Sequence, residues 1–277
     1  SFDAIVQKKD MIGKSPTGSG KTLAFAIPMV QRLLTETEMR TDNDKAPRAL
    51  VISPTRELAK QIEKEFRRIA PSLDIAAFYG GTDYRPQLDA IRRGLDVVIA
   101  TPGRLIDLMQ RDGPSALSME NIETLVLDEA DEMLNMGFKE DIDDILSYTG
   151  DNKNTWLFSA TMPKEIRSIV KSYMKDPVEV KVSVGNQGNE NIEHQYALVN
   201  SSNKFEGLQR ILDSEEGFRG VIFCRTRAAT QQLADNLKKN NYQAEALHGE
   251  MSQVQRDRVM KRFKDHTLQV LVATDVA

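Results

Sequence analysis

The chain is poor in cysteine, histidine and aromatic residues. Its 277 residues include one cysteine, Cys224, and three histidines, and aromatic residues make up 6%. A single cysteine excludes an internal disulfide framework of the kind found in secreted domains. Its place in the apolar run 220–224 favours a small buried side chain over a reactive thiol. The composition fits a reducing compartment, and we expect a cytoplasmic location.

Long apolar runs and a basic excess are also missing. No uninterrupted apolar run approaches the roughly 18 residues that suggest a membrane-spanning helix, so we expect no membrane partner. Ser1 opens neither a signal peptide nor a transit peptide. The net charge is −4, which argues weakly against a nucleic-acid partner. It does not exclude one, because helix N-termini and local basic groups can also bind phosphates.

Short apolar segments alternate with segments of helical pattern along the chain. Because the apolar segments are nearly continuous, they predict parallel sheets covered by helices on both faces, an α/β fold. We expect strands at 10–13, 48–53, 96–100, 124–127, 155–159, 195–199, 220–224, 244–247 and 269–273. We expect helices from about residue 20 and at 56–69, 104–111, 139–148, 164–174, 204–212, 228–239 and 253–264.

The length and one polar segment predict two domains. A chain of 277 residues is long enough for two domains of roughly 150 residues each. Residues 184–191 have the Gly and Asn content of a linker. We therefore expect one α/β lobe over 1–183, a linker over 184–191 and a second lobe over 192–277. The polar segment 35–45 indicates a surface loop.

The segment Ser15-Pro-Thr-Gly-Ser-Gly-Lys-Thr22 lies between an expected strand and an expected helix. It matches the phosphate-loop pattern except that Ser15 replaces the first glycine. Lys21 supplies charge to the β- and γ-phosphates, and the Thr22 hydroxyl is a ligand for Mg²⁺. The alternative is a Gly/Ser turn before an amphipathic helix, but Lys-Thr directly after a glycine favours phosphate binding. The expected phosphate-contacting residues are Thr17, Gly18, Ser19, Gly20, Lys21 and Thr22.

Consecutive carboxylates follow the apolar strand 124–127. Because α/β folds place ligand chemistry at strand ends, Asp128 is positioned to hold Mg²⁺. Glu129 is the better candidate to orient and deprotonate the attacking water. The alternative, a solvated acidic turn, becomes less favoured beside a phosphate loop.

Three further segments fit helix starts as well as ligand sites. Ser159-Ala-Thr161 follows a strand and precedes a helix, and on its own an N-cap is the preferred interpretation. The segment 54–58 is a similar case. In Thr101-Pro-Gly-Arg104, Thr101 fits an N-cap and Pro102 the first helical position. A helix start followed by Arg104 also suits a nucleic-acid phosphate, and both alternatives stay open.

Together these segments resemble the DEAD-box RNA helicases, and Asp131 completes the tetrad of that branch. The resemblance spans the whole chain, with a weaker likeness to bacterial members that act in ribosome assembly and cold adaptation. It includes the pair Gln253 and Arg256 in the second lobe. The segments, in the family's order, are 15–22, 54–58, 80–81, 101–104, 128–131, 159–161, 221–226, 247–256 and 272–277.

The resemblance implies two tandem RecA-like lobes and a set of site residues. ATP and Mg²⁺ would bind the first lobe through Lys21, Thr22 and Asp128, and Asp275 would reach the ribose. Asp131, Ser159 and Thr161 would couple the lobes. His248 also has an alternative as an ordinary turn residue. The implied RNA contacts are Pro54, Thr55, Arg56, Gly81, Thr101, Gly103, Arg104, Arg225, His248, Gly249 and Thr274.

Two departures from the family pattern concern the ends. Gln7 lacks the sequence context of the family's adenine-contacting glutamine, which we expect before Ser1. The family also continues past the segment 272–277 into arginines that complete the ATPase site. We therefore expect the second lobe to be partial and this chain alone to have negligible RNA-stimulated ATPase activity.

The resemblance predicts an RNA-dependent ATPase that binds the RNA backbone without sequence preference and opens short duplexes locally. Two alternatives remain: an ATP-gated RNA clamp with slow hydrolysis, and a DNA helicase. Comparing RNA with DNA of the same sequence as ATPase stimulators tests the DNA-helicase alternative, because the two differ in the 2′-hydroxyl. We expect a monomeric core, with ribosome-assembly or RNA-decay factors as candidate partners.

Overall fold

The computed structural model describes residues 9–15, 20–35, 46–111, 113, 116–181, 192–215 and 217–274. Contacts within the chain divide it into two compact units, Ser1–Gly188 and Asn189–Ala277. Each unit has its own parallel sheet, so the predicted α/β architecture with two lobes is confirmed. None of the described helices is long and apolar enough to cross a membrane.

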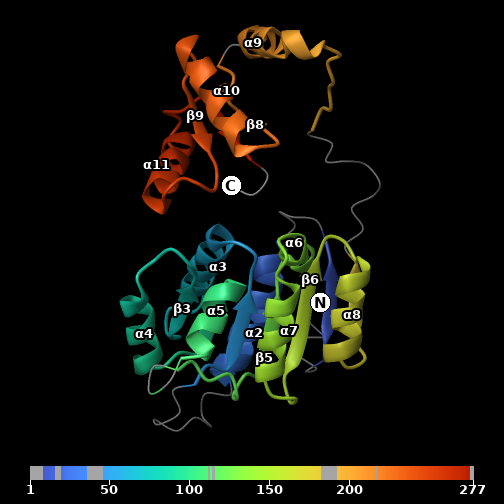
Figure 1. Cartoon of the computed structure of the whole chain (residues 1–277). Coiled ribbons are helices and arrows are strands. Elements are labelled where there is room, and N and C mark those ends of the chain that lie inside the picture. Colours follow the sequence, from blue (N-terminus) through green and yellow to red (C-terminus); the bar gives the residue numbers. More distant parts are fainter. Residues whose placement is uncertain are drawn as a thin grey trace. The chain divides into compact units, whose positions relative to one another are not determined.

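The first unit contains a seven-stranded sheet in the order β3-β4-β2-β5-β6-β1-β7, with all neighbours parallel (Figure 1). Its strands are β1 (Met11–Lys14), β2 (Ala49–Ile52), β3 (Ile75–Phe78), β4 (Val97–Ala100), β5 (Thr124–Leu127), β6 (Asn154–Ser159) and β7 (Val178–Lys181). Its helices are α2 (Lys21–Thr35), α3 (Arg56–Ile69), α4 (Tyr84–Arg93), α5 (Pro102–Met109), α6 (Ala130–Asn135), α7 (Lys139–Tyr148) and α8 (Lys164–Tyr173).

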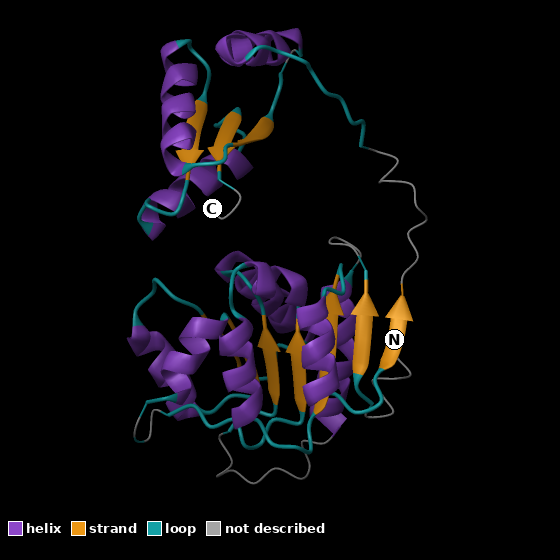
Figure 2. Cartoon of the chain, turned by 45° about the vertical axis from the view of Figure 1, so that its right-hand side comes forward, coloured by secondary structure: helices purple, strands orange, loops and turns teal. Residues whose placement is uncertain are grey.

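Helices cover both faces of this sheet because successive strand side chains point to opposite faces. In β2, Ala49 and Val51 join one buried cluster with α2 and α3, and Leu50 and Ile52 join the other with α4 to α8. Figure 2 shows helices in front of and behind the strands. All four residues of β2 are fully buried, which is why the strand is apolar throughout.

The second unit has a parallel sheet in the order β8-β10-β9. One buried cluster joins the sheet to α9 and α10, and a smaller one joins it to α11. Val221 and Phe223 of β8 stay 42% and 66% exposed. The elements are η2 (Ser201–Asn203), α9 (Lys204–Ser214), β8 (Gly220–Phe223), α10 (Arg227–Lys239), β9 (Ala244–Leu247), α11 (Gln253–Lys264) and β10 (Val270–Ala273).

Most expected elements are present within one or two residues, but the expected strand 195–199 is wrong. Residues 192–200 form no regular secondary structure, and Tyr196 and Leu198 are 90% and 91% exposed. Alternating apolar residues need a neighbouring strand and a core to pack on, but no described strand pairs with this segment, and Tyr196 and Leu198 join no buried cluster of the described residues. The sequence patterns did not predict β3, α4, α6, β7 or η2. The expected loop 35–45 begins one residue too early, because Thr35 is the last residue of α2, and residues 36–45 lie outside the described residues.

Gly13 provides a test of how tightly β1 is packed. A Cβ at this position would lie 2.6 Å from Cδ1 of Phe158, which packs on Phe25 with ring centroids 5.3 Å apart. We predict that Gly13→Ala destabilises the first unit by about 1–3 kcal/mol through overpacking.

Urea unfolding followed by the fluorescence of Trp156, the single tryptophan, measures this change in the first unit. Gly80→Ala is the matched control, because no heavy atom lies within 4 Å of a Cβ there. Equal unfolding midpoints for the two variants would contradict the packing argument.

Candidate nucleotide and nucleic-acid sites

Three candidate nucleotide-site segments follow three strands that lie side by side. β5, β6 and β1 are consecutive in the sheet, and Lys14 pairs in register with Ser159. Since parallel strands end at the same edge, Ser15, Asp128 and the segment after Ser159 lie at one carboxyl edge. Ligands of open α/β sheets bind at this edge.

The described part of the phosphate-loop segment ends in the N-terminus of α2. Gly20 has φ +83°, a conformation that favours glycine, and the helix begins at Lys21. Lys21 is 8% exposed. A helix N-terminus with a buried cation is suited to an anion such as phosphate. The expected contacts Thr17, Gly18 and Ser19 lie outside the described residues, as does Asp275.

Asp128 is a buried carboxylate whose charge is unfavourable in the free protein. It is 2% exposed, and its Oδ1 accepts a hydrogen bond of 3.0 Å from the Glu129 amide. Burial raises the pKa of Asp128 to about 6, although the Lys21 charge acts to lower it. A buried carboxylate of this kind is stabilised by a cation.

Glu129 adopts a left-handed backbone conformation at the N-terminus of α6, with φ 52° and ψ 49°. Such a conformation costs about 1 kcal/mol or more for a residue other than glycine and is frequent at functional sites. Burial raises the pKa of Glu129, and the nearby Lys21 charge opposes this effect. The positive charge of Lys21 therefore acts on the pKa of both Asp128 and Glu129.

Asp131 joins the strand end of β6 to α6. Its Oδ2 accepts hydrogen bonds of 2.8 Å from both the amide and the hydroxyl of Thr161, and the Ser159 hydroxyl donates to the Thr161 carbonyl at 2.6 Å. Burial acts to raise the pKa of Asp131, but the hydrogen bonds from Thr161 and Ser159 hold it below its ordinary value. The preferred N-cap interpretation of 159–161 is wrong, because Pro163 is the N-cap of α8.

The expected RNA contacts of the first unit lie at the same carboxyl edge, toward the β3 side of the sheet. They follow β2, β3 and β4, which are neighbours in the order β3-β4-β2. Thr55 caps α3 by accepting a hydrogen bond of 3.2 Å from the Leu58 amide. Thr101 is the N-cap of α5 by position but makes no side-chain cap hydrogen bond. Gly81 and Gly103 are exposed, so their main chain is open to a ligand.

The arginines of this cluster contact aromatic rings. The Arg56 guanidinium carbon lies 5.5 Å from the centroid of the Tyr79 ring, and that of Arg104 lies 3.9 Å from the Tyr84 ring. Arg104 is only 7% exposed. Tyr79 and Tyr84 were not predicted as site residues, although both are close in sequence to the Gly80-Gly81 pair.

The second unit contains a pocket at the start of α10, lined by Thr226, Arg227, Ala228, Gln231, His248 and Glu250. His248 is 7% exposed, and its Nε2 lies 3.3 Å from Oε1 of Gln231. Its Nδ1 is buried without a hydrogen-bond partner among the described residues. Gly249 and Arg225 are exposed, and the Thr274 amide donates to the Leu247 carbonyl at 3.3 Å.

The opposite pKa shifts of two aspartates predict opposite effects on stability. The raised pKa of Asp128 means that its proton stabilises the folded state, and this stabilisation is lost as the pH rises from 3.8 to about 6. Without nucleotide or metal at pH 7.5, we predict that Asp128→Asn raises the free energy of unfolding by on the order of 2 kcal/mol. This gain should shrink toward pH 4.

Asp131→Asn is the matched control, because its lowered pKa has the opposite sign. Its ionised form stabilises the folded state above the ordinary pKa, so the variant should be less stable than the parent at neutral pH. Urea unfolding, followed by Trp156 fluorescence at pH 4 and 7.5, measures the free energy of unfolding of both variants and of the parent. Destabilisation by Asp128→Asn at pH 7.5 would contradict the buried-charge account.

Two family descriptions match the chain. Residues 1–169 match the family described as "DEAD/DEAH box helicase", and residues 203–277 match the "Helicase conserved C-terminal domain". The first match alone covers more than half of the chain.

Named relatives support the same family. The chain is 42% identical over 274 residues to the DEAD-box ATP-dependent RNA helicase CshA of Streptococcus pneumoniae, covering 98% of this chain and 50% of the relative. It is 41% identical over 276 residues to the ATP-dependent RNA helicase DeaD of Escherichia coli, covering 99% and 42%. The chain thus spans about half the length of the curated relatives it matches.

Solved structures agree. The chain aligns with the crystal structure of a DEAD box protein from the hyperthermophile Methanococcus jannaschii with a TM-score of 0.58 and 38% sequence identity. The alignment covers 99% of this chain and 72% of that chain. A hypothetical ATP-dependent RNA helicase from Sulfolobus tokodaii has a TM-score of 0.59 and 34% identity, with 100% and 76% covered. The chain therefore belongs to the DEAD/DEAH box helicase family.

Proposed function

We propose that the protein is an ATP-dependent RNA helicase or RNA–protein remodelling ATPase that binds the RNA backbone and opens short duplexes locally. One observation supports this most: buried Lys21 and buried Asp128 interact electrostatically at the carboxyl edge of the parallel sheet, where only β6 separates β1 from β5. A cation and a metal-binding acid at that edge are the groups that phosphoryl transfer requires.

The nucleotide is ATP, with its phosphates at the N-terminus of α2. Lys21 contacts the β- and γ-phosphates, and the segment Thr17 to Gly20 supplies main-chain amides. Asp275 reaches the ribose. The family membership supports ATP as the nucleotide.

Mg²⁺ fits the oxygen donors of Thr22 and Asp128. Across the described residues, no group of three or more His, Cys, Asp or Glu side chains could hold a metal ion. This suits Mg²⁺, which takes one or two protein ligands and completes its shell with phosphate oxygens and water. When bound, the ion supplies positive charge that stabilises the phosphate oxygens during transfer.

Glu129 acts as the general base. Glu129 directly follows Asp128 and has a left-handed backbone, and burial raises its pKa, which favours proton uptake. The carboxylate orients the attacking water and takes its proton, while Lys21 holds the phosphate that the water attacks. Asp128 would hold the metal ion and takes no part in this proton transfer.

RNA binds through its backbone, with the proposed first-unit contacts at Pro54, Thr55, Arg56, Gly81, Thr101, Gly103 and Arg104. Exposed glycines and a helix N-terminus contact phosphates without reading bases, so binding is independent of sequence. In the second unit the contacts are Arg225, His248, Gly249 and Thr274. Among the described residues Nδ1 of His248 has no hydrogen-bond partner, and His248 lines a pocket, which supports this assignment.

Asp131, Ser159 and Thr161 couple nucleotide state to the second unit. The hydrogen bonds from Thr161 to Asp131 connect the strand end after β6 with the helix that follows Glu129. A change at the γ-phosphate can therefore shift both segments together.

We propose a monomeric core in the cytoplasm, with ribosome-assembly or RNA-decay factors as partners.

In a full-length version of the protein, which is the parent protein of this test, substitutions of Lys21 and Glu129 distinguish ATP binding from hydrolysis. We predict that Lys21→Ala weakens ATP binding, because a phosphate cluster loses its buried cation. Glu129→Gln should keep ATP binding but slow hydrolysis by about 10²-fold or more, the scale of general-base loss.

Fluorescent ATP-analogue titration measures the first effect, and phosphate release in the presence of RNA measures the second. Glu132→Gln is the control, since Glu132 follows the same strand end but has no proposed role. Normal turnover by Glu129→Gln would contradict the assignment of Glu129 as the general base. Tight RNA retention with little turnover by the parent protein would favour a clamp.

A further inference from the structure

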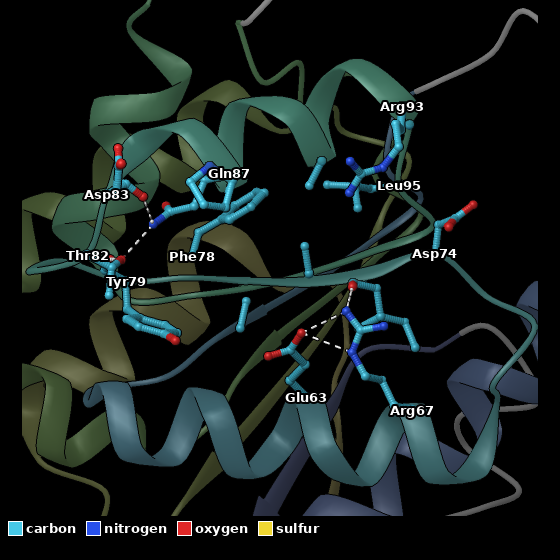
Figure 3. A pocket seen from close by; sticks show the side chains of 16 residues that line it. Glu63, Arg67, Asp74, Phe78, Tyr79, Thr82, Asp83, Gln87, Arg93 and Leu95 are labelled. Atoms are coloured by element: carbon cyan, nitrogen blue, oxygen red, sulfur yellow. Dashed lines mark hydrogen bonds and ion pairs between the residues drawn. The ribbon is translucent and has the colours of Figure 1, made fainter. Parts of the chain in front are cut away.

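Main-chain geometry of the turn that contains Gly80 and Gly81 is set by side chains outside the turn. From one side, Gln87 of α4, which is 7% exposed, donates through Nε2 to the Thr82 hydroxyl at 2.8 Å and to the Asp83 carbonyl at 3.4 Å. The Thr82 hydroxyl donates in turn to the Tyr79 carbonyl at 3.2 Å. Figure 3 shows Gln87 reaching from its helix to Thr82 and Asp83.

Arg104 holds the same turn from the segment after β4. Its Nη1 and Nη2 donate to the Thr82 carbonyl at 3.4 and 3.3 Å. These contacts link residue 82 to a helix that begins 20 residues later, at Pro102. The Thr82 carbonyl is thus fixed by a guanidinium that is almost fully buried.

Tyr84 determines where that guanidinium lies. The Arg104 guanidinium carbon lies 3.9 Å from the centroid of the Tyr84 ring, within the range of a cation–π contact. The Tyr84 hydroxyl donates to Oδ2 of Asp107 at 2.8 Å, and Arg104 Nε lies 4.0 Å from that same oxygen. Nε itself is buried without a hydrogen-bond partner among the described residues. The ring is therefore a main contact that orients Arg104.

Gly81 shows why the turn needs such support. Its φ is +75°, and a Cβ there would lie 2.6 Å from Nη2 of Arg56. The turn is therefore a backbone conformation held in place between two arginines. A phosphate bound by main-chain amides needs those amides to point in one direction before it arrives.

We infer that Tyr84 is a positioning residue of the proposed RNA site. Its ring holds Arg104, and Arg104 holds the Thr82 carbonyl, so that the amides of the Gly80–Gly81 turn are directed at a phosphate. Tyr84 itself contacts no RNA in this account. The inference rests on the proposed function, because it requires that this turn binds RNA.

Removal of the ring should weaken RNA binding without affecting the nucleotide site. We predict that Tyr84→Ala lowers the affinity for a single-stranded homopolymer RNA by about tenfold, which corresponds to a desolvated cation–π contact. Tyr84→Phe keeps the ring and should stay within about twofold of the parent. Tyr84→Leu keeps apolar volume without a π face and should behave as Tyr84→Ala does. ATP-analogue affinity should be unchanged in all three.

A double-mutant cycle with Arg104→Ala distinguishes positioning from a direct role. If Tyr84 acts through Arg104, Tyr84→Ala should add no further loss of RNA affinity in the Arg104→Ala background. Tyr148→Ala is the matched control, because Tyr148 is a 54% exposed tyrosine at the end of α7. Fluorescence anisotropy of labelled RNA measures each affinity, and urea unfolding shows that each variant is folded.

Several outcomes would overturn the inference. Parent-like RNA affinity in the folded Tyr84→Leu variant would do so, as would a full additional loss in the Arg104→Ala background. Loss of affinity in Tyr84→Phe equal to that in Tyr84→Ala would assign the effect to the hydroxyl instead of the ring. Failure of the parent protein to bind RNA would overturn the proposed function itself.

Discussion

The parallel direction of all seven strands in the first unit is the constraint on which both candidate sites depend. It brings the ends of β1, β5 and β6 to one edge and leaves the ends of β3, β4 and β2 beside them. The first group holds Lys21, Asp128 and the segment after Ser159, and the second holds the glycine-rich turn and the start of α5. An antiparallel sheet of the same sequence segments would scatter these groups over two edges.

The nucleotide site lowers the stability of the folded protein when no ligand is bound. Asp128 is charged in a buried place, and Glu129 adopts a left-handed backbone conformation. Both features are tolerated because β5, the strand that ends before Asp128, is buried along its whole length and the Asp131–Thr161 hydrogen bonds fix the neighbouring segment. The same features prepare the site for a cation and for proton transfer, so stability is lower where chemistry is proposed.

Local sequence patterns predicted much of this arrangement. Apolar runs that end in functional residues located β5 with Asp128 and β2 with Pro54, because buried parallel strands are apolar along their whole length. The contact between Arg104 and Tyr84 could not be predicted, since it requires β3 and β4 to be neighbours and no local pattern gives strand order. β3 itself was missed because Ile75–Phe78 is short and contains two alanines. In 195–199 the alternation was present, but Tyr196 and Leu198 have no buried cluster to pack on among the described residues.

We propose that the nucleotide and RNA sites of this chain are coupled, so that ATP changes how RNA is bound. Coupling between two ligands is reciprocal and is measured as a ratio of affinities. The direct measurement is the dissociation constant for single-stranded RNA with and without a non-hydrolysable ATP analogue and Mg²⁺, compared with DNA of the same sequence. We expect RNA to bind at least about tenfold tighter with the analogue, on the scale of typical allosteric coupling, and DNA binding to change little. Equal RNA affinity in the presence and absence of the analogue would contradict this coupling.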